Sequence, residues 1–192
     1  MRRIILASGS PRRQKLLKQM GVKFRVVVAD VEEAQGPCRA ARSICRSNAL
    51  AKSQSVAMGL PGQTVLGADT LVHLDNELFG KPSSLAEAKQ MLRQLSGKTH
   101  QVTTACALVQ DARKIVFSLT TRVQFRELSD SQIDAYLRVV PVLDKAGAYA
   151  VQEKGEWLVE ALHGSLTNVV GLPTELLHAE LTAWFDTAHA RH

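Results

Sequence analysis

Apolar and polar residues along the chain follow two periods, one of alternating positions and one of every third or fourth position. The sequence therefore predicts both strands and helices. Apolar runs and alternating stretches predict strands at Ile4–Leu6, Phe24–Val28, Val65–Leu66, Val102–Val109, Ile115–Phe125 and Trp157–Leu162. Apolar residues at helical spacing predict helices that begin near Pro11, span Arg39–Met58, follow Ser84 and Ser129, and contain Leu176 to Phe185. Strand–helix units and hairpins together indicate the α/β class with a mixed sheet.

Polar residues at the ends of these elements favour turns and helix starts. Ser10 precedes Pro11, a residue suited to the first helical position, and is expected to cap that helix. Ser84 and Ser129 each stand three residues before a Glu or Gln, which is the form of a capping box. Hairpin turns are expected at Asp75-Asn76 and at Asp111–Lys114.

Composition narrows the class of protein. With 192 residues and 45% hydrophobic content, the chain is expected to form one domain over residues 1–192. It lacks an apolar run that could span a bilayer and a secretory leader, so a cytoplasmic location without a membrane partner is expected. The three cysteines have no metal-site spacing and are interpreted as buried thiols.

The net charge of +6 favours anionic partners. The basic residues are spread along the chain, and only two Trp and two Tyr are available to stack on bases. A nucleic-acid-binding module usually has a denser basic patch or an aromatic platform. A small anionic ligand is therefore favoured over a nucleic acid.

The strongest candidate for binding that anion lies between the first strand and the first helix. Ser8, Gly9 and Ser10 are small enough to let the backbone approach a ligand, and the helix start offers unpaired N–H groups. Arg12 and Arg13 lie in the first helical turn, where positive charge opposes the helix dipole. Because the arginine fork suits phosphate oxygens, this segment is interpreted as a phosphate-binding loop rather than a solvated arginine pair.

Carboxylates provide the candidate chemistry. Asp69 is the only charge in an apolar or small run, Val65 to Val72, so it must be hydrogen-bonded, paired or bound to metal. Asp30 to Glu33 follows a strand and is equally consistent with a metal-facing cluster or a solvated turn. Asp144 and Lys145 lie among small residues, consistent with a tight ligand-binding loop or with a surface charge pair.

Several motifs from Leu6 to Pro173 resemble the Maf family of nucleotide pyrophosphatases. They are Leu6–Arg13, Gly67–Thr70, Gly80–Pro82, Leu95–His100, Asp144–Gln152 and Asn168–Pro173, in family order and spacing. The chain departs from the family at Glu32, where Asp is usual, and at Val140, where Glu is frequent. The resemblance implies an elongated mixed β-sheet flanked by helices, with two lobes and a nucleotide-binding cleft, as in inosine triphosphate pyrophosphatases.

The resemblance also implies an activity and its residues. The expected reaction is hydrolysis of dTTP and UTP to the monophosphate and pyrophosphate, with Mg²⁺ or Mn²⁺ as cofactor. Asp69 is expected to be the catalytic acid–base residue, and Glu33 with Asp69 to hold the metal. The expected substrate-binding residues are Ser8, Ser10, Arg12, Arg13, Lys52, Thr70, Lys81, Lys145 and Gln152. Among them Arg12, Thr70 and Gln152 are expected to select the base.

Two alternatives remain open at this stage. One is the same chemistry on 7-methyl-GTP, which the residues at the three base-selecting positions disfavour. The other is a non-catalytic nucleotide-binding regulator of cell division and septum formation. The expected partner is a nucleoside triphosphate, and a homodimer is left open.

Overall fold

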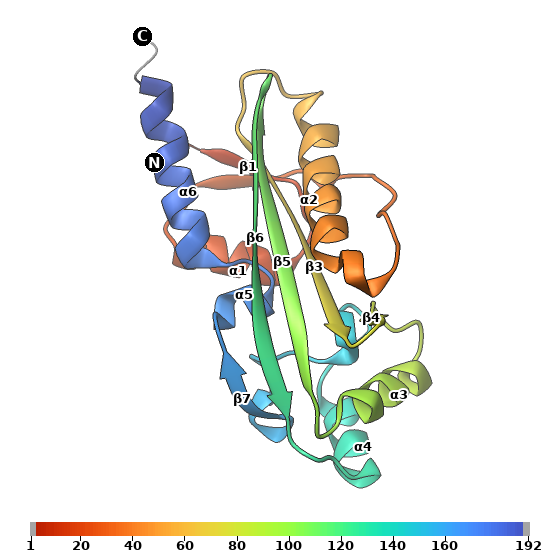
Figure 1. Cartoon of the computed structure of the whole chain (residues 1–192). Helices are drawn as coiled ribbons and strands as arrows, with labels where there is room; N and C mark the ends of the chain where they lie inside the picture. Colours follow the sequence, from red (N-terminus) through yellow and green to blue (C-terminus); the bar gives the residue numbers. More distant parts are fainter. Residues whose placement is uncertain (1–2, 190–192) are drawn as a thin grey trace.

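A computed structural model describes residues 3–189 and contains one seven-stranded mixed sheet (Figure 1). The strands are β1 (Ile4–Leu6), β2 (Phe24–Val26), β3 (Val65–Leu74), β4 (Glu77–Phe79), β5 (Thr99–Gln110), β6 (Arg113–Phe125) and β7 (Val159–His163). Their order is β2-β1-β3-β5-β6-β7, and β4 pairs with β3. Strand β1 is parallel to β2 and β3, and the remaining pairs are antiparallel. This sheet confirms the predicted α/β class.

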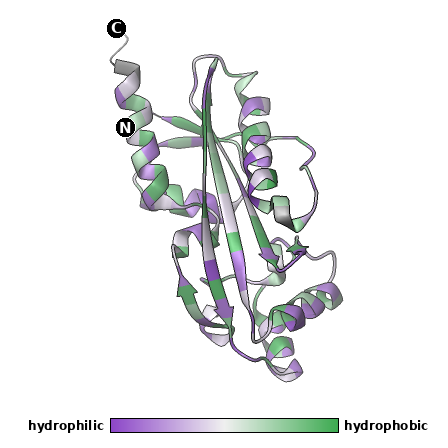
Figure 2. Ribbon diagram, in the orientation of Figure 1, coloured by the Kyte–Doolittle hydropathy of each residue, from purple (hydrophilic) through white to green (hydrophobic). Residues whose placement is uncertain are grey.

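Six α-helices within residues 3–189 surround the sheet. They are α1 (Pro11–Gln19), α2 (Ala41–Ala57), α3 (Leu85–Leu95), α4 (Asp130–Val139), α5 (Leu166–Val170) and α6 (Thr174–His189). Strands β3, β5 and β6 run along the length of the molecule, with α2 and α6 near one end and α3 and α4 near the other (Figure 1). The helices carry both hydrophobic and hydrophilic residues along their lengths, as expected for elements with one buried face (Figure 2).

Two large hydrophobic cores lie along the elongated sheet. One packs α1 and α6 against the first strands and includes Leu17, Leu66 and Trp184. The other packs α3 and α4 against the far ends of the long strands and includes Leu92 and Tyr136. Helix α2 packs on the sheet through smaller clusters of cysteine, alanine, valine and isoleucine side chains. The two-lobed arrangement therefore follows from two cores that share the same three strands.

One glycine sets how closely α2 approaches the sheet. A Cβ atom on Gly67 would lie 2.4 Å from the Ala49 carbonyl oxygen and 2.4 Å from Ser53 Oγ. The missing side chain of Gly67 therefore leaves the room that α2 needs to lie against the strand. This contact fixes the distance between the polar side chains of α2 and strand β3.

Several predicted boundaries differ from the structure. Strand β2 ends at Val26 rather than Val28, α2 follows a 3₁₀ turn at Cys38–Ala40, and α5 was not predicted. Strand β7 begins only at Val159, because another 3₁₀ turn precedes it. These elements are short, so periodicity over a few residues does not define them.

The predicted helix caps divide into one confirmed capping box and two corrections. Ser129 and Gln132 form the reciprocal box at α4. Ser84 caps α3, but the Glu87 carboxylate accepts from the Ser83 N–H and hydroxyl groups instead of returning to Ser84. Ser10 precedes α1 without a capping hydrogen bond from its side chain.

The cysteine prediction is confirmed, since Cys38, Cys45 and Cys106 are all buried free thiols. Burial raises the pKa of Cys106 to about 12 and also raises the pKa of Cys45.

Within residues 3–189, no helix is both long and apolar enough to cross a bilayer.

Candidate active site

The candidate site lies at an interruption in the edge of the sheet. Strand β1 pairs with Val65 and Leu66 of β3, and β4 pairs with Val72 to Leu74, so residues 67–71 have no strand partner on that side. A cavity of about 840 Å³ opens at this interruption. Its walls come from the loop after β1, the segment before α2, helix α2, strand β3 and the loop after α4. All the candidate catalytic, metal-binding and substrate-binding residues line it: Ser8, Ser10, Arg12, Arg13, Glu33, Lys52, Asp69, Thr70, Lys81, Lys145 and Gln152.

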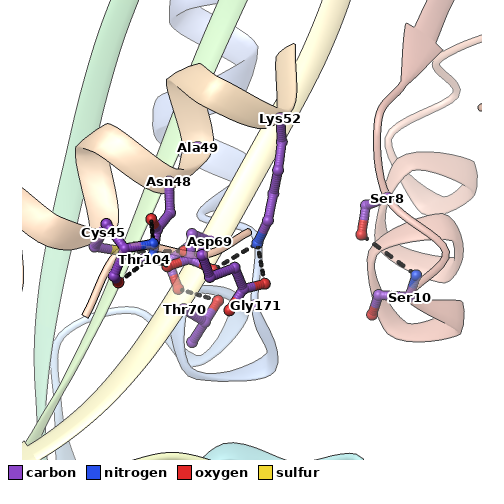
Figure 3. Close-up of polar contacts among 12 residues, drawn as sticks. Ser8, Ser10, Cys45, Asn48, Ala49, Lys52, Asp69, Thr70, Thr104 and Gly171 are labelled. Carbon is purple, nitrogen blue, oxygen red and sulfur yellow. Dashed lines mark hydrogen bonds and ion pairs between the residues drawn. The ribbon is translucent and has the colours of Figure 1, made fainter. Parts of the chain in front are cut away.

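Helix α2 supplies the groups that hold Asp69. The Asp69 side chain is almost fully buried, and Lys52 Nζ donates to its Oδ1 at 2.7 Å. Asn48 Nδ2 donates to Oδ2 at 3.2 Å, so both carboxylate oxygens have a partner (Figure 3). The prediction that Asp69 must be hydrogen-bonded, paired or bound to metal is confirmed, since it is both hydrogen-bonded and ion-paired. Its partners lie on α2, which can approach β3 closely because Gly67 has no side chain.

Glu33 joins the same charge cluster. Its Oε1 lies 2.7 Å from Lys52 Nζ, so one ammonium group bridges Glu33 and Asp69. Asn48 also accepts from the Ala34 N–H at 2.8 Å and donates to the Ala34 carbonyl at 3.2 Å. The amide of Asn48 thereby fixes the loop that carries Glu33. Glu33 thus lines the cavity and is paired with Lys52, which a purely solvated turn would not require.

Sequence reasoning missed Asn48. The signal was present, because Asn48 lies four residues before Lys52 and therefore on the same helical face. An amide one turn from a cationic candidate, facing a buried aspartate, completes the set of donors that the carboxylate needs.

Arg13 forms hydrogen bonds to three segments of the cavity wall. Its Nη1 donates to Ser8 Oγ at 3.0 Å, its Nη2 to Thr70 Oγ1 at 3.1 Å, and its Nε to the Gly171 carbonyl at 3.0 Å. Burial lowers the pKa of Arg13, and the negative charge of Asp69 opposes that shift. The guanidinium therefore links the loop after β1, strand β3 and the turn after α5.

Arg12 reaches the opposite wall. Its Nη1 donates to Asp144 Oδ2 at 2.6 Å, and Lys145 Nζ donates to Asp144 Oδ1 at 2.8 Å. Partial burial alone would raise the pKa of Asp144, but the hydrogen bonds from Lys145 and Arg12 outweigh it and hold that pKa below its ordinary value. Asp144 is thus an ionised bridge between two cations and was not among the predicted ligand-binding residues.

Three candidates, Ser10, Lys81 and Gln152, remain to be placed, and all three line the cavity. Ser8 Oγ accepts from the Ser10 N–H at 3.3 Å, which curls the loop (Figure 3). Lys81 is exposed at the rim, and the Gln152 amide donates to Glu153 Oε1 at 3.2 Å. The exposed side chains of Lys81 and Gln152 can therefore turn toward a ligand at small cost.

The residues present fit a divalent cation. Glu33 and Asp69 converge on one positive centre, the Lys52 ammonium, and carboxylate oxygens are the ligands that Mg²⁺ and Mn²⁺ prefer. No group of three or more His, Cys, Asp or Glu side chains in residues 3–189 is placed to hold a metal alone.

Comparison with known proteins shows which proteins this chain is similar to. A sequence model described as Maf-like protein matches residues 3–184. Proteins described as dTTP/UTP pyrophosphatase from Bacillus anthracis (strain CDC 684 / NRRL 3495), Bacillus cereus (strain ZK / E33L) and Bacillus mycoides (strain KBAB4) are each 46% identical over 191 residues, covering 99% of this chain and 100% of the relative. The structure of the Staphylococcus aureus Ham1 protein has a TM-score of 0.57 at 20% identity and covers 95% of this chain and 99% of that chain. That likeness concerns the fold alone.

Proposed function

The chain belongs to the Maf-like protein family, and from this membership we propose that it hydrolyses dTTP and UTP to the monophosphate and pyrophosphate. The observation that carries the proposal is Asp69, a buried carboxylate that lines the cavity among cationic side chains. Relatives that are 46% identical over their full length bear the name dTTP/UTP pyrophosphatase. A cavity with both a carboxylate and phosphate-binding cations suits hydrolysis of a phosphoanhydride better than binding alone.

In the proposed reaction, water attacks the α-phosphorus and the bond to the bridging oxygen of pyrophosphate breaks. Asp69 accepts the proton of that water, while Lys52 holds the Asp69 carboxylate in place through its 2.7 Å contact. Arg12, Lys81 and Lys145 line the same cavity, where their charges stabilise the negative charge that builds up on the triphosphate. The leaving pyrophosphate stays in this positive environment until release.

Glu33 and Asp69 would hold the divalent cation. When bound, it would neutralise part of the triphosphate charge and lower the pKa of the attacking water. Lys52 Nζ lies 2.7 Å from an oxygen of each of these carboxylates.

Base selection is assigned to Arg12, Thr70 and Gln152. All three line the cavity, and the Gln152 amide can both donate to and accept from the edge of uracil or thymine. The Thr70 hydroxyl also forms hydrogen bonds with Arg13 and Thr104.

The test is pyrophosphate release from a panel of nucleoside triphosphates with Mg²⁺ or Mn²⁺. We expect preferential turnover of dTTP and UTP, and a loss of at least about a hundredfold in kcat for Asp69→Asn, because general-base catalysis contributes about 10²–10⁴-fold. Glu33→Gln should raise the metal concentration needed for activity. The adjacent Glu32→Gln is the matched control, since Glu32 is exposed and does not line the cavity.

Two outcomes would contradict the proposal. Turnover confined to 7-methyl-GTP would keep the chemistry and overturn the assignment of the base-selecting residues. A folded protein that binds nucleotides without releasing pyrophosphate would favour the regulatory alternative.

A further inference from the structure

A line of polar groups crosses the sheet behind the cavity. Thr70 of β3 and Thr104 of β5 are direct cross-strand partners, and their Oγ1 atoms lie 3.0 Å apart (Figure 3). Thr104 is fully buried, whereas Thr70 is partly exposed and lines the cavity. Neither the reaction proposed above nor the sequence motifs use Thr104.

The direction of each hydrogen bond in this line can be assigned. Thr104 Oγ1 lies 2.8 Å from the backbone carbonyl oxygen of Asn168. A carbonyl oxygen can only accept, so the single Thr104 hydroxyl proton points toward it. Thr70 must then donate its own proton to Thr104. Arg13 Nη2 can only donate, so Thr70 accepts from it at 3.1 Å.

The far end of the line is fixed. Asn168 is fully buried, and its Nδ2 donates to the Val102 carbonyl at 2.9 Å and to Thr121 Oγ1 at 3.0 Å. Its own N–H donates to Ser165 Oγ, the cap of α5. These contacts fix the position of Asn168, so its backbone carbonyl cannot turn away from the Thr104 hydroxyl.

We infer that Thr104 is a positioning residue that makes the Thr70 hydroxyl an acceptor toward substrate and so favours bases with a proton on N3. One lone pair of Thr70 Oγ1 remains for the ligand, because the proton and the other lone pair are committed. Uracil and thymine carry an N3–H donor, whereas the N3 of cytosine is itself an acceptor. This inference rests on the proposed hydrolysis of dTTP and UTP and adds to it a preference for these nucleotides over cytosine nucleotides.

The test compares kcat/KM for UTP and CTP in three proteins. Thr104→Val keeps the side-chain shape and removes the hydroxyl, which frees the Thr70 proton to turn toward substrate. We expect the UTP-to-CTP ratio to fall about tenfold or more, the worth of roughly one hydrogen bond to a polar group, with an absolute rise for CTP. Thr104→Ser keeps the hydroxyl and should restore the wild-type ratio.

A second measurement uses the wild-type protein and avoids any folding defect of the variant. UTP methylated on N3 lacks the donor and should lose about tenfold or more in kcat/KM relative to UTP. Equal turnover of the methylated and unmodified nucleotides would overturn the inference, as would a Thr104→Val protein in which UTP and CTP fall equally. A wild-type protein that hydrolyses neither dTTP nor UTP would instead refute the proposed function.

Discussion

At the scale of single residues, Asn48 connects the Asp69 carboxylate to the loop that carries Glu33. Its amide binds Asp69 Oδ2 and both backbone groups of Ala34. Asn48→Ala should lower kcat about tenfold with a smaller change in KM, because a buried hydrogen bond to a charged group contributes about 1.5–3 kcal/mol and Lys52 still holds the other oxygen. Steady-state kinetics with UTP measures this split between kcat and KM.

Ser47→Ala is the matched control on the same helix, since Ser47 is exposed and lies outside the cavity. It should behave as the wild-type protein. An Asn48→Ala protein with the kcat of the Ser47→Ala protein would show that Lys52 alone orients Asp69.

At the scale of elements, the contact between α2 and β3 determines both stability and the geometry of the site. Gly67→Ala would place a methyl group 2.4 Å from the Ala49 carbonyl oxygen, so α2 must move outward. We expect a loss of about 1–3 kcal/mol in the free energy of unfolding, the usual range for overpacking, measured by urea denaturation. Activity should fall as well, because α2 carries Lys52.

Gly59→Ala is the control at the end of α2, where an added Cβ meets its nearest atom at 3.9 Å. That substitution should change the free energy of unfolding by less than about 0.5 kcal/mol. Equal stability of the two variants would mean that α2 and β3 adjust to each other without cost.

At the scale of the whole molecule, His100 makes the free energy of unfolding depend on pH in the acid range. It lies against Tyr149 of the core formed by α3, α4 and the long strands. Its Nε2 lies 2.8 Å from the Tyr149 hydroxyl, its Nδ1 has no partner, and its side chain is fully buried. Burial, with a smaller contribution from His73, lowers the pKa of His100 from 6.5 to about 4. Folding therefore favours the neutral ring. Its contribution is complete above about pH 6.5 and is lost as the pH falls toward about 4.

The expected consequence is a fall in the free energy of unfolding of up to about 3 kcal/mol across that interval, measured by urea denaturation at successive pH values. His100→Gln should remove that part of the pH dependence. The exposed His178→Gln should leave it unchanged. A His100→Gln protein with the wild-type slope would assign the acid sensitivity to other groups.

Much of the fold was predictable because its signals are local. The helix that starts at Pro11, the capping box of Ser129 and the hairpin at Asp111 depend on residues a few positions apart. The short α5 was not predictable, since its five residues are stabilised by packing and by the Ser165 cap rather than by periodicity. The hydrogen bond between Asn168 and Thr104 joins residues 64 positions apart, so only the folded structure reveals it.

The sequence by itself determined that Asp69 must find a partner, that the Ser8–Arg13 segment leads from a strand into a helix, and that the chain favours an anionic ligand. Only the tertiary structure decided which groups meet. Lys52 lies between Glu33 and Asp69, Arg13 braces Thr70 from within, and Arg12 reaches Asp144, 132 positions along the chain. The physical reason is that local propensity and burial act over a few residues, whereas these hydrogen bonds join segments that only the folded sheet brings together.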